Sequence, residues 1–178
     1  SRVAIVPRGH EFSSETPDGK KGLTWKTRYG AVALDMIGKD CFADGLNEKG
    51  LAVNYLYLPG ISEYQSYDPS KAEISMGPAL MATYVLTQFA TSDEVKKGMG
   101  RVRVVAIPEP ALGGAPAPMH LMVTDKSGKV IVIEYLEGEL KIRDNPVRVL
   151  TNAPSFDWHL TNLSNYVNLS VVPYPPKK

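Results

Sequence analysis

Val-Leu-Thr-Asn-Ala-Pro-Ser-Phe-Asp-Trp-His-Leu-Thr-Asn-Leu-Ser-Asn-Tyr, residues 149–166, predicts a corner between a strand and a helix. The apolar residues at 147–150 are typical of the end of a buried strand, and Pro154 cannot continue a ladder of hydrogen bonds. Ser155 suits the N-cap of a helix, because apolar residues recur from position 156 at helical spacing. Asn152 therefore lies at the corner itself.

The side chain of Asn152 has two interpretations. At such a corner an asparagine commonly makes local hydrogen bonds to the backbone of its own turn. The alternative is that its amide group donates a hydrogen bond to an oxyanion that develops during a reaction. The residues around Asn152 leave both interpretations open.

Outward from this corner, the chain divides into blocks of strands and helices. Strands are predicted at 3–6, 23–27, 29–36, 41–44 and 51–58, and helices at 77–89 and 91–98. Further extended segments follow at 102–106, 119–124, 130–135, 140–143 and 147–150. Separate blocks of this kind predict an α+β fold with antiparallel sheets, since an alternating order would be typical of a parallel sheet.

Turn and cap signals mark the connections between these elements. Residues 11–22 are polar and are expected to form a loop around the turn at 17–19. A tight connection through Arg28 is expected to pair the two strands on either side of it. Residues 47–50 predict a tight turn in which Gly50 supplies a positive φ. Residues 91–94 form a capping box for the second helix.

Composition limits the classes of function. The chain has 178 residues, of which 43% are hydrophobic, with a net charge of +1. This balance predicts no nucleic-acid or membrane partner. A single cysteine excludes a disulfide framework within the chain, and the three histidines lack the spacing of metal ligands. We expect one domain over residues 1–170, followed by a proline-rich tail at 171–178.

Residues 3–9, 44–51 and 150–154, Val-Ala-Ile-Val-Pro-Arg-Gly, Asp-Gly-Leu-Asn-Glu-Lys-Gly-Leu and Leu-Thr-Asn-Ala-Pro, together resemble the choloylglycine hydrolase family of bile salt hydrolases and penicillin V acylases. Asp44-Gly-Leu-Asn-Glu-Lys-Gly-Leu51 is close to the family's Asp-Gly-x-Asn-Glu-x-Gly-Leu turn. Val3-Ala-Ile-Val-Pro-Arg-Gly9 is similar to an early family strand, and Leu150-Thr-Asn-Ala-Pro154 resembles the family's Thr-Asn-x-Pro segment. His120, Asp125, Gly128 and Glu134 fit between these stretches in the family's order.

The resemblance implies a fold and an activity. The fold is part of the four-layer αββα sandwich of N-terminal nucleophile hydrolases, with antiparallel sheets. The activity is hydrolysis of a linear, nonpeptide amide C–N bond, by attack of an N-terminal cysteine whose own α-amino group is the base. The substrate is an acylated β-lactam first and a conjugated bile salt second. No metal or organic cofactor is implied, and the source is bacterial, with cytoplasm and periplasm both open.

The resemblance also implies two donors for the oxyanion. One is the side-chain amide of Asn152, and the other is the backbone N–H of Tyr57, on the strand after the Asn-Glu-x-Gly-Leu turn. Tyrosine at this position is similar to penicillin V acylases, whereas many bile salt hydrolases have asparagine. Without the resemblance, Tyr57 is an ordinary half-buried aromatic residue of a strand.

The loop after Tyr57 is a candidate wall for the acyl pocket. Leu58, Ile61, Tyr64 and Tyr67 would give it an aromatic and aliphatic surface that suits a phenoxyacetyl or steroid group. The alternative is an ordinary surface loop that carries unrelated tyrosines.

The chain departs from the family at its start. The Cys-Thr start and Arg-x-x-Asp hairpin of the family are absent ahead of Val3, so residues 1–178 are expected to be an internal segment. Ser1 as the nucleophile conflicts with the strand register, and Cys41 fits better as a small buried residue. A noncatalytic chain or binding module is therefore the alternative function. An incomplete sandwich would expose a sheet, so we expect a complementary segment or a homo-oligomer.

Overall fold

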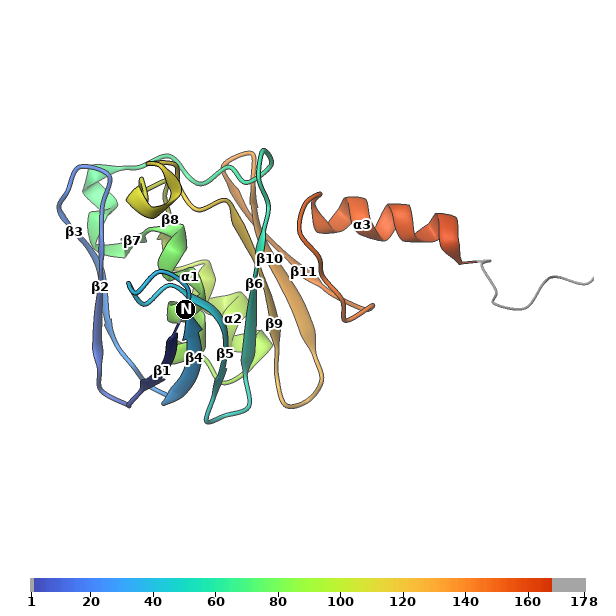
Figure 1. Cartoon of the computed structure of the whole chain (residues 1–178), viewed down its shortest axis with the longest axis horizontal. Coiled ribbons are helices and arrows are strands. Elements are labelled where there is room, and N and C mark those ends of the chain that lie inside the picture. The colour runs from blue at the N-terminus through green and yellow to red at the C-terminus, as the bar shows by residue number, and fades with distance from the viewer. Residues whose placement is uncertain (1, 168–178) are drawn as a thin grey trace, which may run out of the picture.

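The computed structural model describes residues 2–167, and its centre is a seven-stranded sheet, antiparallel throughout (Figure 1). In spatial order its strands are β1 (Arg2–Val6), β4 (Ala31–Asp35), β5 (Phe42–Asn47), β6 (Ala52–Tyr57), β9 (Met119–Thr124), β10 (Val130–Leu136) and β11 (Glu139–Asp144). Two small sheets pair β2 (Glu11–Glu15) with β3 (Lys21–Lys26) and β7 (Ser75–Met76) with β8 (Arg103–Val104). Ser1 and the predicted tail at 171–178 lie outside the described residues.

The helices lie in two places. Helices α1 (Met81–Gln88) and α2 (Ser92–Met99) lie on one side of the large sheet, and α3 (Phe156–Leu163) lies beside its β10–β11 end (Figure 1). Short 3₁₀ turns are η1 (Pro69–Ile74), η2 (Pro78–Leu80), η3 (Pro110–Leu112) and η4 (Ser164–Tyr166). The blocks of strands and helices confirm the predicted α+β class with mostly antiparallel sheets, and β7 and β8 pair in parallel.

The main core lies between the large sheet and α1. Every second residue of β4 is buried toward the helix, whereas Val32 and Leu34 on the other face are exposed. Helix α1 packs directly on β5 and β6. Gly45 permits this approach, because a Cβ atom there would lie 2.5 Å from Cδ2 of Leu86. The sequence motif around Gly45 therefore sets how closely helix and sheet pack.

The region predicted as a polar loop at 11–22 is partly wrong. Residues 11–15 form strand β2, in which Phe12 and Ser14 are buried, and β2 pairs with β3. The predicted pairing of the strands on either side of Arg28 is also wrong, because β4 pairs with β1 and β5 instead. The N–H groups of Arg28 and Tyr29 both donate to the carbonyl of Thr87. At these two residues the chain passes from the β2–β3 sheet to the large sheet.

The prediction of a strand at 147–150 is wrong as well. The segment forms no strand, and Val149 is 67% exposed. Arg148 has a φ of 57°, in the left-handed region that breaks an extended chain. The side chain of Asn145 stabilises this bend, because it accepts from the Arg148 N–H and donates to the Val149 carbonyl. A local hydrogen-bond pattern therefore replaces a place in the sheet.

The predicted turn at Gly50 and the Thr91 cap are confirmed, whereas Ser155 lies at the N-cap position of α3 without a capping hydrogen bond from its side chain. Gly50 closes the β5–β6 turn with a φ of 81°. Thr91 caps α2, since its Oγ1 accepts from the Glu94 N–H at 3.2 Å. The carboxylate of Glu94 reaches back to the N–H of Ala90, one residue earlier than a capping box requires.

The face of the large sheet opposite α1 is apolar and partly open to solvent. Its exposed residues come from β1, β4 and β5, and they are Val3, Ile5, Val32, Leu34 and Leu46, with exposed fractions from 44% to 80%. The part of the same face over β9 and β10 is covered by the segment that precedes α3 (Figure 1). Contiguous exposed apolar side chains of this kind are typical of an interaction surface.

Candidate active site

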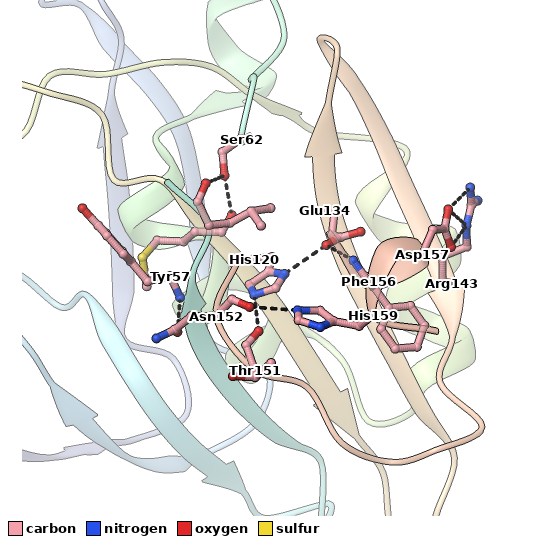
Figure 2. A network of polar contacts seen from close by, with 12 residues as sticks. Tyr57, Ser62, His120, Glu134, Arg143, Thr151, Asn152, Phe156, Asp157 and His159 are labelled. Carbon is pink, nitrogen blue, oxygen red and sulfur yellow. Dashed lines mark hydrogen bonds and ion pairs between the residues drawn. The ribbon is translucent and has the colours of Figure 1, made fainter. Parts of the chain in front are cut away.

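The turn that carries Asn152 is hydrogen-bonded to the end of β6. The N–H of Tyr57, the last residue of β6, donates to Asn152 Oδ1 at 2.9 Å (Figure 2). The N–H of Ala153 donates to the carbonyl of Tyr57 at 2.8 Å. Two residues that lie 95 positions apart in the sequence are thereby in direct contact.

The two candidate donors have different availability. The Tyr57 N–H needs an acceptor, so the oxygen of the Asn152 amide faces it. Within residues 2–167, this is the one hydrogen bond of the Asn152 side chain, and its Nδ2 group is free to donate. An anion that accepted from both groups would have to replace Oδ1 at the Tyr57 N–H. The Asn152 Nδ2 group can therefore donate as it stands. The Tyr57 N–H can donate to another acceptor only after the Asn152 side chain has rotated away.

A buried histidine and glutamate support this turn from the sheet below. Nδ1 of His120 lies 3.0 Å from Oε1 of Glu134, and Nε2 lies 3.0 Å from the carbonyl oxygen of Thr151 (Figure 2). The same Oε1 accepts from the N–H of Phe156 at 2.9 Å. His120 is fully buried and Glu134 is 2% exposed.

The sequence pattern gives His120 no metal-ligand spacing, and it does not by itself identify Glu134 as the partner of His120. The register that pairs Leu121 with Ile133 places His120 opposite Glu134 on neighbouring strands. Leu121 and Ile133 belong to the core beneath the helices, so alternation directs His120 and Glu134 to the opposite face. A histidine and a glutamate at facing positions of an apolar hairpin are the sequence signal that could have found this pair.

A cavity of about 300 Å³ lies next to Tyr57 and Asn152. Its other lining residues are largely apolar, and they are Met36, Ile37, Cys41, Tyr55, Ala79, Glu109, Leu112, Ala117 and Met119. A mostly apolar cavity with a few polar groups at one end is the usual form of a small-molecule site. The arrangement can hold an apolar group while a polar group beside it meets the Asn152 amide.

Cys41 lines this cavity but is not a reactive thiol. It is 2% exposed, immediately before β5, as the sequence analysis expected of a small buried residue. Burial raises the pKa of the Cys41 thiol to about 12, and the nearby carboxylates of Asp35 and Glu109 act in the same direction. The thiolate is the nucleophilic form, so Cys41 is essentially unreactive at neutral pH.

The described residues offer no metal centre. Within residues 2–167, no group of three or more His, Cys, Asp and Glu side chains is arranged to hold a metal ion. In the same part of the chain, every helix is too short or too polar to span a bilayer.

Comparison with known proteins gives the family. The model for linear amide C–N hydrolases of the choloylglycine hydrolase family matches residues 1–177. The chain belongs to the choloylglycine hydrolase family. The bile salt hydrolase/transferase of Clostridium perfringens is 36% identical over 171 residues, which cover 94% of this chain and 50% of the relative. The penicillin V acylase of Pectobacterium atrosepticum is 36% identical over 149 residues, 80% of this chain and 39% of the relative.

Solved structures of choloylglycine hydrolase relatives have the same fold. A mutant of the conjugated bile acid hydrolase from Clostridium perfringens matches with a TM-score of 0.80 and 30% identity, over 99% of this chain and 52% of that chain. The penicillin V acylase from Agrobacterium tumefaciens matches with a TM-score of 0.78 and 31% identity, over 94% of this chain and 49% of that chain. The predicted N-terminal nucleophile hydrolase fold is confirmed, and the chain spans about half the length of these relatives.

The four predicted pocket residues of this family member are not among the residues that line the cavity described above. Leu58 is fully buried in the core. The Tyr64 hydroxyl donates to the carbonyl of Ala117 at 2.5 Å, and the Tyr67 hydroxyl donates to Asp18 at 2.9 Å. Ile61 is half-buried. Their role as substrate ligands stays a prediction, and the residues that line the cavity beside Asn152 are a different set.

Proposed function

We propose that this chain supplies the oxyanion donors and the acyl pocket of an enzyme that hydrolyses a linear, nonpeptide amide bond. The single observation that carries the proposal is the contact of Tyr57 N–H with the Asn152 side chain beside an apolar cavity. Membership of a family of linear amide C–N hydrolases supports the reaction class.

The proposed reaction follows from how an amide is cleaved. A thiolate attacks the carbonyl carbon, the carbonyl oxygen becomes an oxyanion, and Asn152 Nδ2 donates a hydrogen bond to it. The C–N bond then breaks, the amine leaves with a proton, and water hydrolyses the thioester. The thiol of Cys41 is buried and protonated, so the attacking cysteine is proposed to come from polypeptide outside these 178 residues.

The size of the cavity favours a penicillin V acylase-like substrate over a conjugated bile salt. At about 300 Å³ the cavity is at the small end of the range for ligand sites. A single aromatic ring with a short linker, as in a phenoxyacetyl group, suits this space better than four fused rings. Apolar side chains such as Met119 and Leu112 would contact the ring.

A substrate comparison tests this function. The purified protein that contains this chain is given penicillin V and, separately, glycine- and taurine-conjugated bile salts, and the released amine is measured. We expect kcat/KM for penicillin V to exceed that for either conjugate by about tenfold, a typical effect of pocket shape. The reverse order makes the protein a bile salt hydrolase. Saturable binding of these compounds without turnover favours the alternative, a noncatalytic binding module.

We also propose that residues 1–170 are part of one domain whose exposed apolar face is covered by another layer of the same protein. The support is one core cluster that runs from Val6 to Tyr135, together with the exposed apolar side chains of β1, β4 and β5. In an N-terminal nucleophile hydrolase fold, a second sheet is the natural occupant of such a face. A homo-oligomer is the competing occupant.

Thiol labelling tests whether this face is covered. Leu46 and Lys49 are both exposed in residues 2–167, and Leu46 lies on the apolar face whereas Lys49 lies on the β5–β6 turn. In the intact protein we expect a Leu46→Cys variant to react with a thiol reagent about tenfold more slowly than Lys49→Cys, because access controls the rate. Equal rates contradict the proposal, and protection that disappears on dilution indicates a homo-oligomer.

A further inference from the structure

We propose that His120 and Glu134 are positioning residues for Asn152. They act through the backbone on both sides of it, since His120 bonds the carbonyl of Thr151 and Glu134 bonds the N–H of Phe156. This inference rests on the proposed function, in which the Asn152 amide stabilises the oxyanion. The pair would keep that amide in place before the substrate arrives.

The contacts of the pair fix where its protons lie. The Thr151 carbonyl can only accept, so Nε2 of His120 carries a hydrogen. Oε1 of Glu134 already accepts from the Phe156 N–H, and one further proton lies between it and Nδ1 of His120. Every one of these buried groups then has a partner, and removing either side chain leaves some of them unsatisfied, which is costly in a buried site.

The pair lies inside the large sheet and not at its edge. His120 belongs to β9 and Glu134 to β10, two inner strands that pair with neighbours on both sides. Both side chains are nearly or completely buried. Sites held on strands are more precise than sites on loops, because the rotamers are fixed by packing and hydrogen bonds. The sheet can therefore hold an exposed turn at a defined position.

The turn is tied down at four successive points. The carbonyl of Thr151 bonds His120, and the carbonyl of Asn152 lies 3.0 Å from Nε2 of His159. The N–H of Ala153 donates to the end of β6, and the N–H of Phe156 donates to Glu134. The His159 contact is solvent-exposed, whereas the Phe156 contact is buried and the Thr151 contact is partly buried, so water replaces these two less readily.

A positioning role predicts a specific kinetic signature. His120 and Glu134 are not among the residues that line the cavity beside Asn152, so they would not contact the acyl group. A misplaced oxyanion donor weakens binding of the transition state alone, which lowers kcat and leaves KM unchanged. A role in stability alone would lower the melting temperature without this split.

Three variants and two controls separate these roles. His120→Ala removes both contacts of the ring. His120→Gln keeps a donor that can reach the Thr151 carbonyl, and is expected to restore part of the loss. Glu134→Gln has the same shape but cannot both accept from the Phe156 N–H and donate to Nδ1 with one atom. His10→Ala and Glu139→Gln are matched controls, since both side chains are exposed and lie outside the site.

The experiment uses the whole protein that contains this chain, with two readouts. The first is kcat and KM on its amide substrate, and the second is hydrogen exchange of the backbone amides of Tyr57 and Ala153. We expect kcat to fall about tenfold to a hundredfold in His120→Ala and Glu134→Gln, with KM within about twofold, because small misplacements cost this much. Both amides should exchange about tenfold faster, and the controls should match the unaltered protein.

Each result decides the proposal. Unchanged kcat in the folded variants overturns it. A lower kcat together with a raised KM and a lower melting temperature, without recovery in His120→Gln, also overturns it. If His120→Ala does not fold, the isosteric Glu134→Gln decides alone. If the protein turns over no amide, the proposed function fails and the exchange readout decides separately. Faster exchange in the variants alone then supports positioning of the turn, and unchanged exchange overturns it.

Discussion

Replacing Asn152 by aspartate is expected to lower kcat by about a hundredfold to a thousandfold, the usual effect of losing one oxyanion donor. Aspartate keeps an oxygen that accepts from the Tyr57 N–H, so the turn stays docked on β6. It lacks the Nδ2 group and adds negative charge beside the developing oxyanion. The measurement is steady-state turnover of the amide substrate by the whole protein.

Two comparison variants make the Asn152 result specific. Asn152→Ala also removes the oxygen from the Tyr57 N–H, which frees that group, so a smaller loss than with aspartate is expected. Asn165→Ala changes an exposed residue of η4 outside the site, and its turnover should match the unaltered protein. Turnover of Asn152→Asp within a few-fold of the unaltered protein would remove Asn152 from the mechanism.

Replacing Asn47 by alanine is expected to lower the free energy of unfolding by about 3 to 5 kcal/mol, because four hydrogen bonds, three of them buried, are lost at about 1 kcal/mol each. Nδ2 of Asn47 donates to the carbonyls of Leu86 and Phe89, at 2.8 Å each. Oδ1 accepts from the N–H groups of Lys49 and Leu51 at 2.9 and 3.1 Å. The side chain therefore ties the β5–β6 turn to the end of α1.

Chemical denaturation followed by fluorescence checks this loss. Trp25 is a suitable reporter, since it is buried and its indole N–H donates to Thr87 of α1. Asn165→Ala is again the control, because substitutions of exposed residues usually change stability by less than about 0.5 kcal/mol. A loss of under about 1 kcal/mol in Asn47→Ala would mean that water or a neighbouring group replaces the four bonds.

The Asn47 network gives a physical reason for the motif at 44–51. Gly45 allows α1 to approach the sheet, and Asn47 then bonds the carbonyls at the end of that helix. Gly50 closes the turn with a positive φ. The motif that marks the family in the sequence thus also joins the helix layer to the sheet layer in the structure.

Sequence patterns failed in two segments whose local composition disagrees with the contacts that they make in the folded chain. Strand β2 is polar along most of its length, and only the burial of Phe12 and Ser14 against other elements makes it a strand. The segment at 147–150 has the apolar composition of a strand, but Asn145 and the left-handed Arg148 bend it away from the sheet. Local composition cannot weigh such competing contacts.

The candidate site also has parts that the sequence predicted and parts that only the structure revealed. The corner at Asn152 and the strand end at Tyr57 were predicted from local patterns and a family resemblance, and the structure places them in contact. The cavity beside them is formed by segments from 36 to 119, so no single stretch of sequence indicates it. The pocket residues that were predicted follow Tyr57 in sequence, and none of the four is among the residues that line this cavity.

The sequence by itself determined the α+β class, the hairpin turn at Gly50, the Thr91 cap of α2 and the family, because each depends on neighbouring residues or on short motifs. Only the tertiary structure decided which strands pair, which residues line the cavity, and that His120 and Glu134 hold the turn of Asn152 from two strands of the sheet. The reason is physical. A turn or cap is a contact over a few residues, whereas these features join residues far apart in the chain, and their energies depend on burial that exists only after folding.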